Sequence, residues 1–133
     1  MSIIYYYQIL RFWYKMSKLK KSKSLSHDDL IDILAYTFRL GKIDLIEPYL
    51  SDDFVFRSEY IFGYPKDKKE SVKWMKQYVE RDKGSKMLTT KSPYTGNTWL
   101  RFSKKPRSCY LGMKCENGKI SFIALCSQIC DRQ

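Results

Sequence analysis

Apolar side chains recur at helical spacing in two stretches of the chain and predict two long helices. The first follows Ser26, which has the capping-box spacing with Asp29, and Gly41 is expected to end it. The second is expected from about Asp67 to Lys83, with its apolar residues along one stripe.

The stretch Leu45–Tyr60, between the two long helices, predicts a short helix, a turn and a strand. A Ser-Asp-Asp turn at residues 51–53 limits the short helix. The residues that follow alternate as in a strand with one face toward a core. The inward face of this strand is expected to carry Phe54, Phe56, Ser58 and Tyr60.

The last third of the chain alternates as strands do, and four are expected, at 86–94, 98–103, 107–116 and 119–127. Asn117-Gly118 predicts a two-residue hairpin loop, because a type I′ turn needs positive φ at both central positions. Such a loop pairs residue 116 with residue 119 and gives the hairpin one apolar face toward the core. That face is expected to carry Cys109, Leu111, Met113, Cys115, Ile120, Phe122, Ala124 and Cys126.

The same register sets Cys109 opposite Cys126, close enough for a disulfide. The alternative is two buried thiols that pack as small apolar groups, and the lack of an export signal favours it. Ile123 and Leu125 fall on the other face of the hairpin, where joint exposure would indicate a partner surface.

Residues 3–14 form an apolar and aromatic run that is too short to span a bilayer. Three alternatives remain: an extra element packed on the domain, an interfacial anchor backed by lysines, or an upstream extension with Met16 as the natural start. The third is favoured. Residues 1–24 are therefore read as an extension and linker, and residues 25–133 as a single domain.

Composition fits one globular domain of 133 residues with 44% hydrophobic residues. The net charge is +11, but residues 1–27 hold six basic and no acidic residues, which leaves 19 basic and 14 acidic residues elsewhere. The domain is thus only mildly basic, and no specific nucleic-acid partner is expected. With one histidine and no CxxC pair, no metal is expected either, and no cofactor. We expect a cytoplasmic protein.

Two helices, a strand, a third helix and a run of strands give an α+β order. Together with the residues, this order resembles the nuclear-transport-factor-2-like superfamily, in particular its SnoaL-like branch. The resemblance covers about residues 26–128 and rests on LAYTFRLGKIDLIEPYLSDDFVF, KKESVKWMKQYVE and CENGKISFIALC. It implies a cystatin-like, cone-shaped α+β barrel, in which a curved antiparallel sheet wraps around three helices and leaves a pocket at its open end.

Members of this superfamily include ketosteroid isomerases, dehydratases and proteins that only bind or dimerise. Matching the Ser-Asp-Asp turn to the isomerase pattern puts the general base at Ser58, and a serine without a basic partner cannot take a proton from carbon. Glu59 and Tyr36 are the other candidate catalytic residues, although alternation points Glu59 away from the cone. His27 and Asp32 qualify only if the first helix faces the mouth of the cone.

The sequence therefore favours a binding protein over an enzyme. We expect a homodimer through the outer face of the sheet, with a small apolar or amphipathic ligand inside the cone. The alternatives are an isomerase or cyclase with a non-standard acid-base residue, and an interaction module whose basic residues 1–24 dock on an acidic lipid surface or on nucleic acid. The expected pocket lining is Phe56, Ser58, Tyr60, Trp74, Tyr78 and Met113, which otherwise simply fill the cone.

Overall fold

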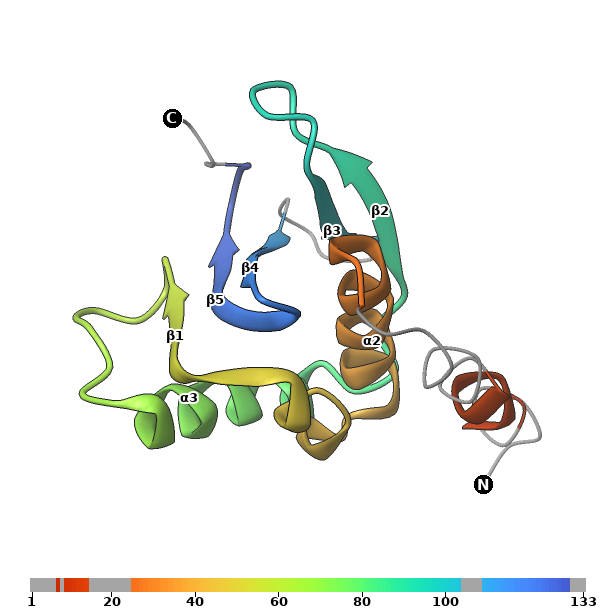
Figure 1. The fold of residues 1–133 in the computed structure, drawn as a ribbon, viewed down its shortest axis with the longest axis horizontal. Coiled ribbons are helices and arrows are strands. Elements are labelled where there is room, and N and C mark those ends of the chain that lie inside the picture. Colours follow the sequence, from red (N-terminus) through yellow and green to blue (C-terminus); the bar gives the residue numbers. More distant parts are fainter. Residues whose placement is uncertain (1–6, 8, 15–24, 104–108, 130–133) are drawn as a thin grey trace.

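The computed structural model describes residues 7, 9–14, 25–103 and 109–129 (Figure 1). No helix in these ranges is long and apolar enough to cross a membrane. The elements in chain order are α2 (His27–Leu40), η1 (Ile43–Leu45), η2 (Glu47–Tyr49), β1 (Leu50–Ser58), α3 (Lys68–Arg81), β2 (Met87–Lys91), β3 (Thr98–Phe102), β4 (Tyr110–Glu116) and β5 (Lys119–Cys126).

Both long helices begin and end close to the predicted residues. The Ser26 hydroxyl accepts from the Asp29 amide, the Asp29 carboxylate accepts from the Ser26 amide, and Gly41 ends α2 with a φ of 69°. Asp67 caps α3 by accepting from the Glu70 amide. These caps supply partners for amide groups that have none inside a helix, so the sequence defines the helix starts.

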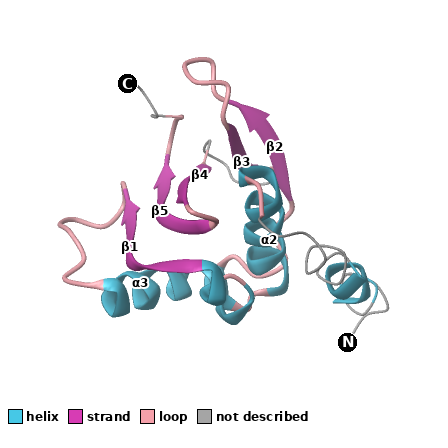
Figure 2. Cartoon of the chain, viewed as in Figure 1, coloured by secondary structure: helices cyan, strands magenta, loops and turns pink. Residues whose placement is uncertain are grey.

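The five strands form one curved sheet in the order β1-β5-β4-β3-β2. Figure 2 shows α3 along β1 and α2 beside β3, and both helices contact those strands. The predicted cone-shaped α+β architecture is confirmed. The sheet is mixed, however, because β1 runs parallel to β5 while the other pairs are antiparallel.

The segment between α2 and β1 differs from the prediction. The expected short helix is two 3-10 turns, η1 and η2, and the expected turn at residues 51–53 lies inside β1. Leu50 is buried and pairs with Ile120, so sheet pairing extends the chain where Ser-Asp-Asp alone favours a turn. The pairing shifts between Leu50 and Val55, and β1 bends along its length (Figure 1).

The β4–β5 hairpin has the predicted turn but not the predicted register. Asn117 and Gly118 have φ values of 53° and 74°, as a type I′ turn requires. Cys115 still pairs with Ile120, but Lys114 pairs with Phe122, so Ser121 is an extra residue in β5.

This bulge exchanges the two faces of β5 beyond Ser121. Ile123 and Leu125 are fully buried in the core, while Phe122, Ala124 and Cys126 lie on the opposite face. The prediction that the latter three face the core is wrong. The exchange buries the two larger aliphatic side chains, which gain more from leaving water than alanine or cysteine would.

Cys109 and Cys126 form no disulfide with each other, and Tyr110, not Cys109, pairs with Cys126. The bulge therefore removes the geometry that the less favoured alternative, a Cys109–Cys126 disulfide, requires.

Residues 9–14 are helical and contact the domain through Phe12. The Phe12 ring is 4% exposed and lies edge-on to Tyr36, with 5.4 Å between ring centroids. This contact is what the packed-element alternative requires of the N-terminal run. Residues 15–24, which include the linker expected at 18–24, lie outside the described residues.

Candidate ligand-binding groove

The interior of the cone next to β1 is filled by side chains. Phe56 is fully buried, and its ring lies 5.8 Å from that of Tyr78. The Ser58 hydroxyl lies 2.9 Å from the Tyr78 hydroxyl and accepts from the Tyr60 amide at 3.1 Å. These residues, which were expected to line a pocket, pack against one another there.

The remaining predicted lining residues lie in different surroundings. Tyr60 is 51% exposed beyond the end of β1, and Trp74 packs at the edge of the core. Met113 is buried in β4. Two cavities are described below. Ser58 and Met113 line the larger one, and the other four predicted residues line neither cavity: Phe56, Tyr60, Trp74 and Tyr78.

The larger cavity is a groove of about 450 Å³ over β1, β5, β4 and β3. Arg57, Ala124 and Gly112 are paired neighbours across three strands at this groove. They alternate with the buried residues that face the helices, so the groove lies on the outer face of the sheet. It is lined by Arg57, Ser58, Glu59, Tyr64, Thr95, Asn97, Trp99, Gly112, Met113, Lys114, Phe122, Ala124, Leu125 and Cys126.

An indole ring lies against bare backbone in this groove. A Cβ at Gly112 would lie 2.5 Å from Cη2 of Trp99, closer than real contacts allow. Glycine is therefore required for Trp99 to lie flat on β4, where only 5% of it is exposed. Ala124 and Phe122 of β5 continue the apolar lining beside it.

Charged groups line the other part of the groove. The guanidinium of Arg57 stacks on the Tyr64 ring at 3.5 Å from its centroid, and its buried Nη1 has no hydrogen-bond partner among the described residues. Both carboxylate oxygens of Glu59 accept from Ser127, at 2.9 Å from the amide and 3.0 Å from the hydroxyl. The groove thus combines an apolar lining with an incompletely bonded cation.

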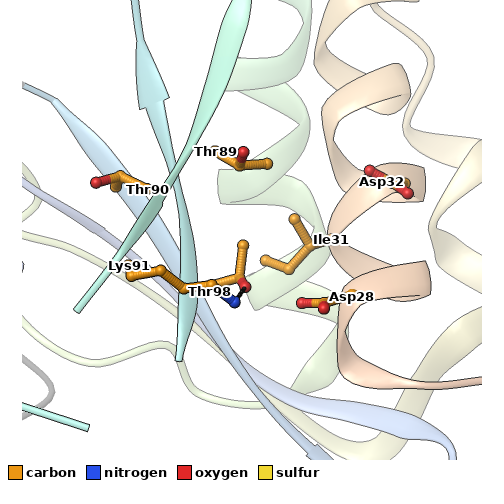
Figure 3. Close-up of a pocket in the computed structure, with 7 residues that line it drawn as sticks. All are labelled: Asp28, Ile31, Asp32, Thr89, Thr90, Lys91 and Thr98. Atoms are coloured by element: carbon orange, nitrogen blue, oxygen red, sulfur yellow. Dashed lines mark hydrogen bonds between the residues drawn. The ribbon is translucent and has the colours of Figure 1, made fainter. Parts of the chain in front are cut away.

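A second cavity of about 300 Å³ lies between α2 and the β2–β3 pair. Figure 3 shows Asp28 and Asp32 on α2 facing Thr89, Lys91 and Thr98 of the two strands. The first helix therefore does bring Asp32 to a cavity, whereas His27 does not line it and lies 3.2 Å from the Met113 carbonyl. The Lys91 ammonium donates to Thr98 at 2.7 Å, and six of the seven lining residues are of polar type.

Of the three candidate catalytic residues, Ser58 and Glu59 line the groove and Tyr36 does not. Ser58 is bonded to Tyr78, and Tyr36 packs against Phe12. Glu59 lines the groove, because the groove is on the outer face to which strand alternation directs it.

Among the described residues, no group of three or more His, Cys, Asp or Glu side chains is placed to hold a metal ion. Cys115 is a thiol whose pKa burial raises to about 11. It therefore stays protonated at neutral pH and is a poor nucleophile.

Sequence analysis missed Arg57, Tyr64, Trp99 and Gly112 as groove residues. A glycine inside an expected strand does signal a close approach of another group, and Gly112 carries that signal. The partner in that approach, Trp99, lies on another strand. Only the sheet order brings these two residues together.

The sequence matches no known family profile and no curated protein. Solved structures match instead. One is an uncharacterised cystatin-fold protein from Novosphingobium aromaticivorans, with a TM-score of 0.56 and 10% identity over 77% of this chain and 99% of that one. Another is an NTF2-like protein of unknown function from Cytophaga hutchinsonii, with a TM-score of 0.52 and 14% identity over 79% and 91% of the two chains.

A third similar structure is the Orange Carotenoid Protein of Anabaena binding canthaxanthin, with a TM-score of 0.50 and 10% identity. The match covers 77% of this chain but only 36% of that protein. At such identities the similarity shows a shared fold and nothing more about chemistry.

Proposed function

For a chain with the NTF2-like, cystatin-type fold, we propose that the function is to bind a small amphipathic ligand in the groove over β1, β5, β4 and β3. The observation that carries the proposal is the pairing of an apolar lining with the unbonded Nη1 of Arg57. Ligand sites typically have a concave, mostly apolar lining with a few polar groups that fix orientation. The fold neighbour that binds canthaxanthin supports a ligand-binding use of this scaffold.

A neutral fluorescent probe, N-phenyl-1-naphthylamine, tests the groove without involving charge. We expect saturable binding by the full chain and a roughly tenfold loss in Ala124→Phe, which fills the groove. Val55→Phe adds the same ring to the outer face of β1 without lining the groove or the proposed dimer contact, and serves as the matched control. Far-UV circular dichroism checks that both variants fold. Absent saturable binding, or equal binding by Ala124→Phe, would contradict the proposal.

The proposal includes a homodimer through the outer face of the sheet. Leu88 of β2 is 37% exposed there and Tyr110 of β4 is half-buried; neither lines the groove, so they support an apolar contact that leaves the groove open. Sedimentation equilibrium should give a dimer for the unmodified chain and a monomer for Leu88→Lys. A monomeric unmodified chain removes this part of the proposal. We also propose a cytoplasmic location, which the thiol of Cys115, in no disulfide, supports.

An acid-base enzyme is the second candidate function, and one observation favours it. Glu59 is the carboxylate among the residues that line the groove. If it is a general base, Glu59→Gln should abolish turnover of a bound substrate while leaving its affinity within about twofold. Equal turnover by Glu59→Gln would exclude this role.

A further inference from the structure

The guanidinium of Arg57 is not fully hydrogen-bonded by the described residues around it. A guanidinium stays protonated at any physiological pH and has five N–H donors. Its Nη1 is buried yet has no hydrogen-bond partner among the described residues. Burying an unpaired charged donor is costly, so the position calls for an acceptor from outside the chain.

The neighbouring groups leave that donor free. Glu59, two residues along β1, has both oxygens engaged by Ser127. Tyr64 contacts the guanidinium through its ring, 3.5 Å from centroid to Cζ. Stacking uses the flat face of the guanidinium and leaves the N–H groups in its plane available.

The charges around the groove also fit an anion. Its lining includes two cations, Arg57 and Lys114, and one anion, Glu59. The Lys114 ammonium lies 5.9 Å from the Phe122 ring centroid, on the opposite side of β5 from Arg57. Trp99, Phe122 and Ala124 supply apolar surface in the same groove.

Resting on the proposed groove, we infer that its ligand is a monocarboxylate with an apolar body. The carboxylate accepts from Arg57, and the body lies on Trp99, Phe122 and Ala124. The planar guanidinium matches the two oxygens of a carboxylate, and such charge-assisted bonds are about twice as strong as neutral ones. One net positive charge in the lining matches one negative charge on the ligand.

Calorimetric titration with octanoate, octanol and octyl phosphate tests this assignment on the full chain. We expect octanoate to bind more tightly than octanol. In Arg57→Gln the affinity for octanoate should fall by about tenfold or more, while the affinity for octanol stays unchanged, because only the carboxylate accepts from the guanidinium. Arg57→Lys keeps the charge without the planar fork and should give an intermediate loss.

Arg101→Gln is the matched control. Arg101 is exposed on the same face of the sheet but does not line the groove, so its loss changes the net charge equally. Octanoate affinity should stay unchanged in this variant. An equal effect of both substitutions would mean that only overall charge attracts the acid, which overturns the inference.

The remaining outcomes separate this inference from the proposed function. If the affinities for octanoate and octanol fall equally in Arg57→Gln, Arg57 shapes the groove without binding the carboxylate, and the carboxylate assignment is overturned. Tighter binding of octyl phosphate would assign the site to phosphates instead. If the neutral naphthylamine binds and octanoate does not, only the inference of a carboxylate ligand is overturned. If neither binds, the proposed function of the groove is overturned as well.

Discussion

At the scale of single residues, the groove depends on one close approach. Trp99 lies flat on β4 because position 112 has no side chain. An indole held against backbone offers a large rigid surface at little further entropy cost, as ligand contacts require. The same approach makes Gly112 intolerant of even a methyl group.

Gly112→Ala should destabilise the fold by about 1–3 kcal/mol, because the new Cβ overlaps the Trp99 ring. Equilibrium urea unfolding measures the loss. Trp99→Leu removes the ring atoms involved, so adding Gly112→Ala to that variant should cost clearly less. Equal costs in the two backgrounds would show that the indole does not determine the choice of glycine.

A second residue-scale prediction concerns pH. Burial raises the pKa of the Cys115 thiol from 9.0 to about 11 in the folded chain. The thiol therefore loses its proton at a lower pH in the unfolded state than in the folded state. Its contribution to the free energy of unfolding is fully present below pH 9 and falls as the pH rises from 9 toward 11. Half-exposure of the residue reduces the effect through solvent screening.

Urea unfolding of the unmodified chain and Cys115→Ala, from about pH 8 to about pH 10.5, isolates this contribution because other groups titrate equally in both. The stability difference between the two proteins should shift in favour of Cys115→Ala as pH rises. A constant difference across the range would contradict the prediction.

At the scale of elements, the bulge at Ser121 decides which face of β5 meets the helices. The Asn117-Gly118 turn sets the pairing only as far as Cys115 and Ile120. Beyond it, one extra residue brings Ile123 and Leu125 into the core and leaves Phe122 and Ala124 for the groove. The groove therefore exists because the strand departs from simple alternation.

Tyr110→Cys tests this register directly. Tyr110 pairs with Cys126, so the new thiol at position 110 should form a disulfide with Cys126 under mild oxidation. Intact mass without reductant, followed by peptide mapping, detects the bond. The unmodified chain is the control and should show no bond between Cys109 and Cys126. A disulfide between Cys109 and Cys126 would indicate that β4 and β5 pair without the bulge, and would contradict the prediction.

At the scale of the whole molecule, the N-terminal helix presents two surfaces. Phe12 packs against Tyr36, whereas other large apolar side chains of this helix are exposed. Residues 1–27 add six basic residues and no acidic ones. Aromatic side chains beside lysines suit the interface of an anionic bilayer, so membrane contact stays a prediction for this segment. The exposed side chains are Tyr7, Leu10, Trp13 and Tyr14.

Cosedimentation with phosphatidylserine vesicles tests that contact. The full chain should bind at low salt, and binding should fall steeply as salt increases. Leu10→Ser combined with Trp13→Ser should reduce it while leaving the Phe12 contact in place. Removal of residues 1–15 should abolish it. Unchanged vesicle binding after that truncation would contradict the prediction.

The sequence by itself determined the local features of this protein. Helix caps at Ser26 and Asp67 and the Asn117-Gly118 turn are set by residues within a few positions of each other, so their bonds can be read from spacing. The order of these elements predicted the α+β class, and the resemblance to the nuclear-transport-factor-2-like superfamily implied the cone.

Only the tertiary structure decided the parallel pairing of β1 with β5, the bulge at Ser121 and the site on the outer face. Each depends on contacts between residues far apart in the chain, such as Trp99 with Gly112. A shift of one residue in strand pairing moves every side chain beyond it to the opposite face of the sheet, and no local interaction opposes that shift. The site therefore follows from how the strands are paired, which the pattern along one strand does not contain.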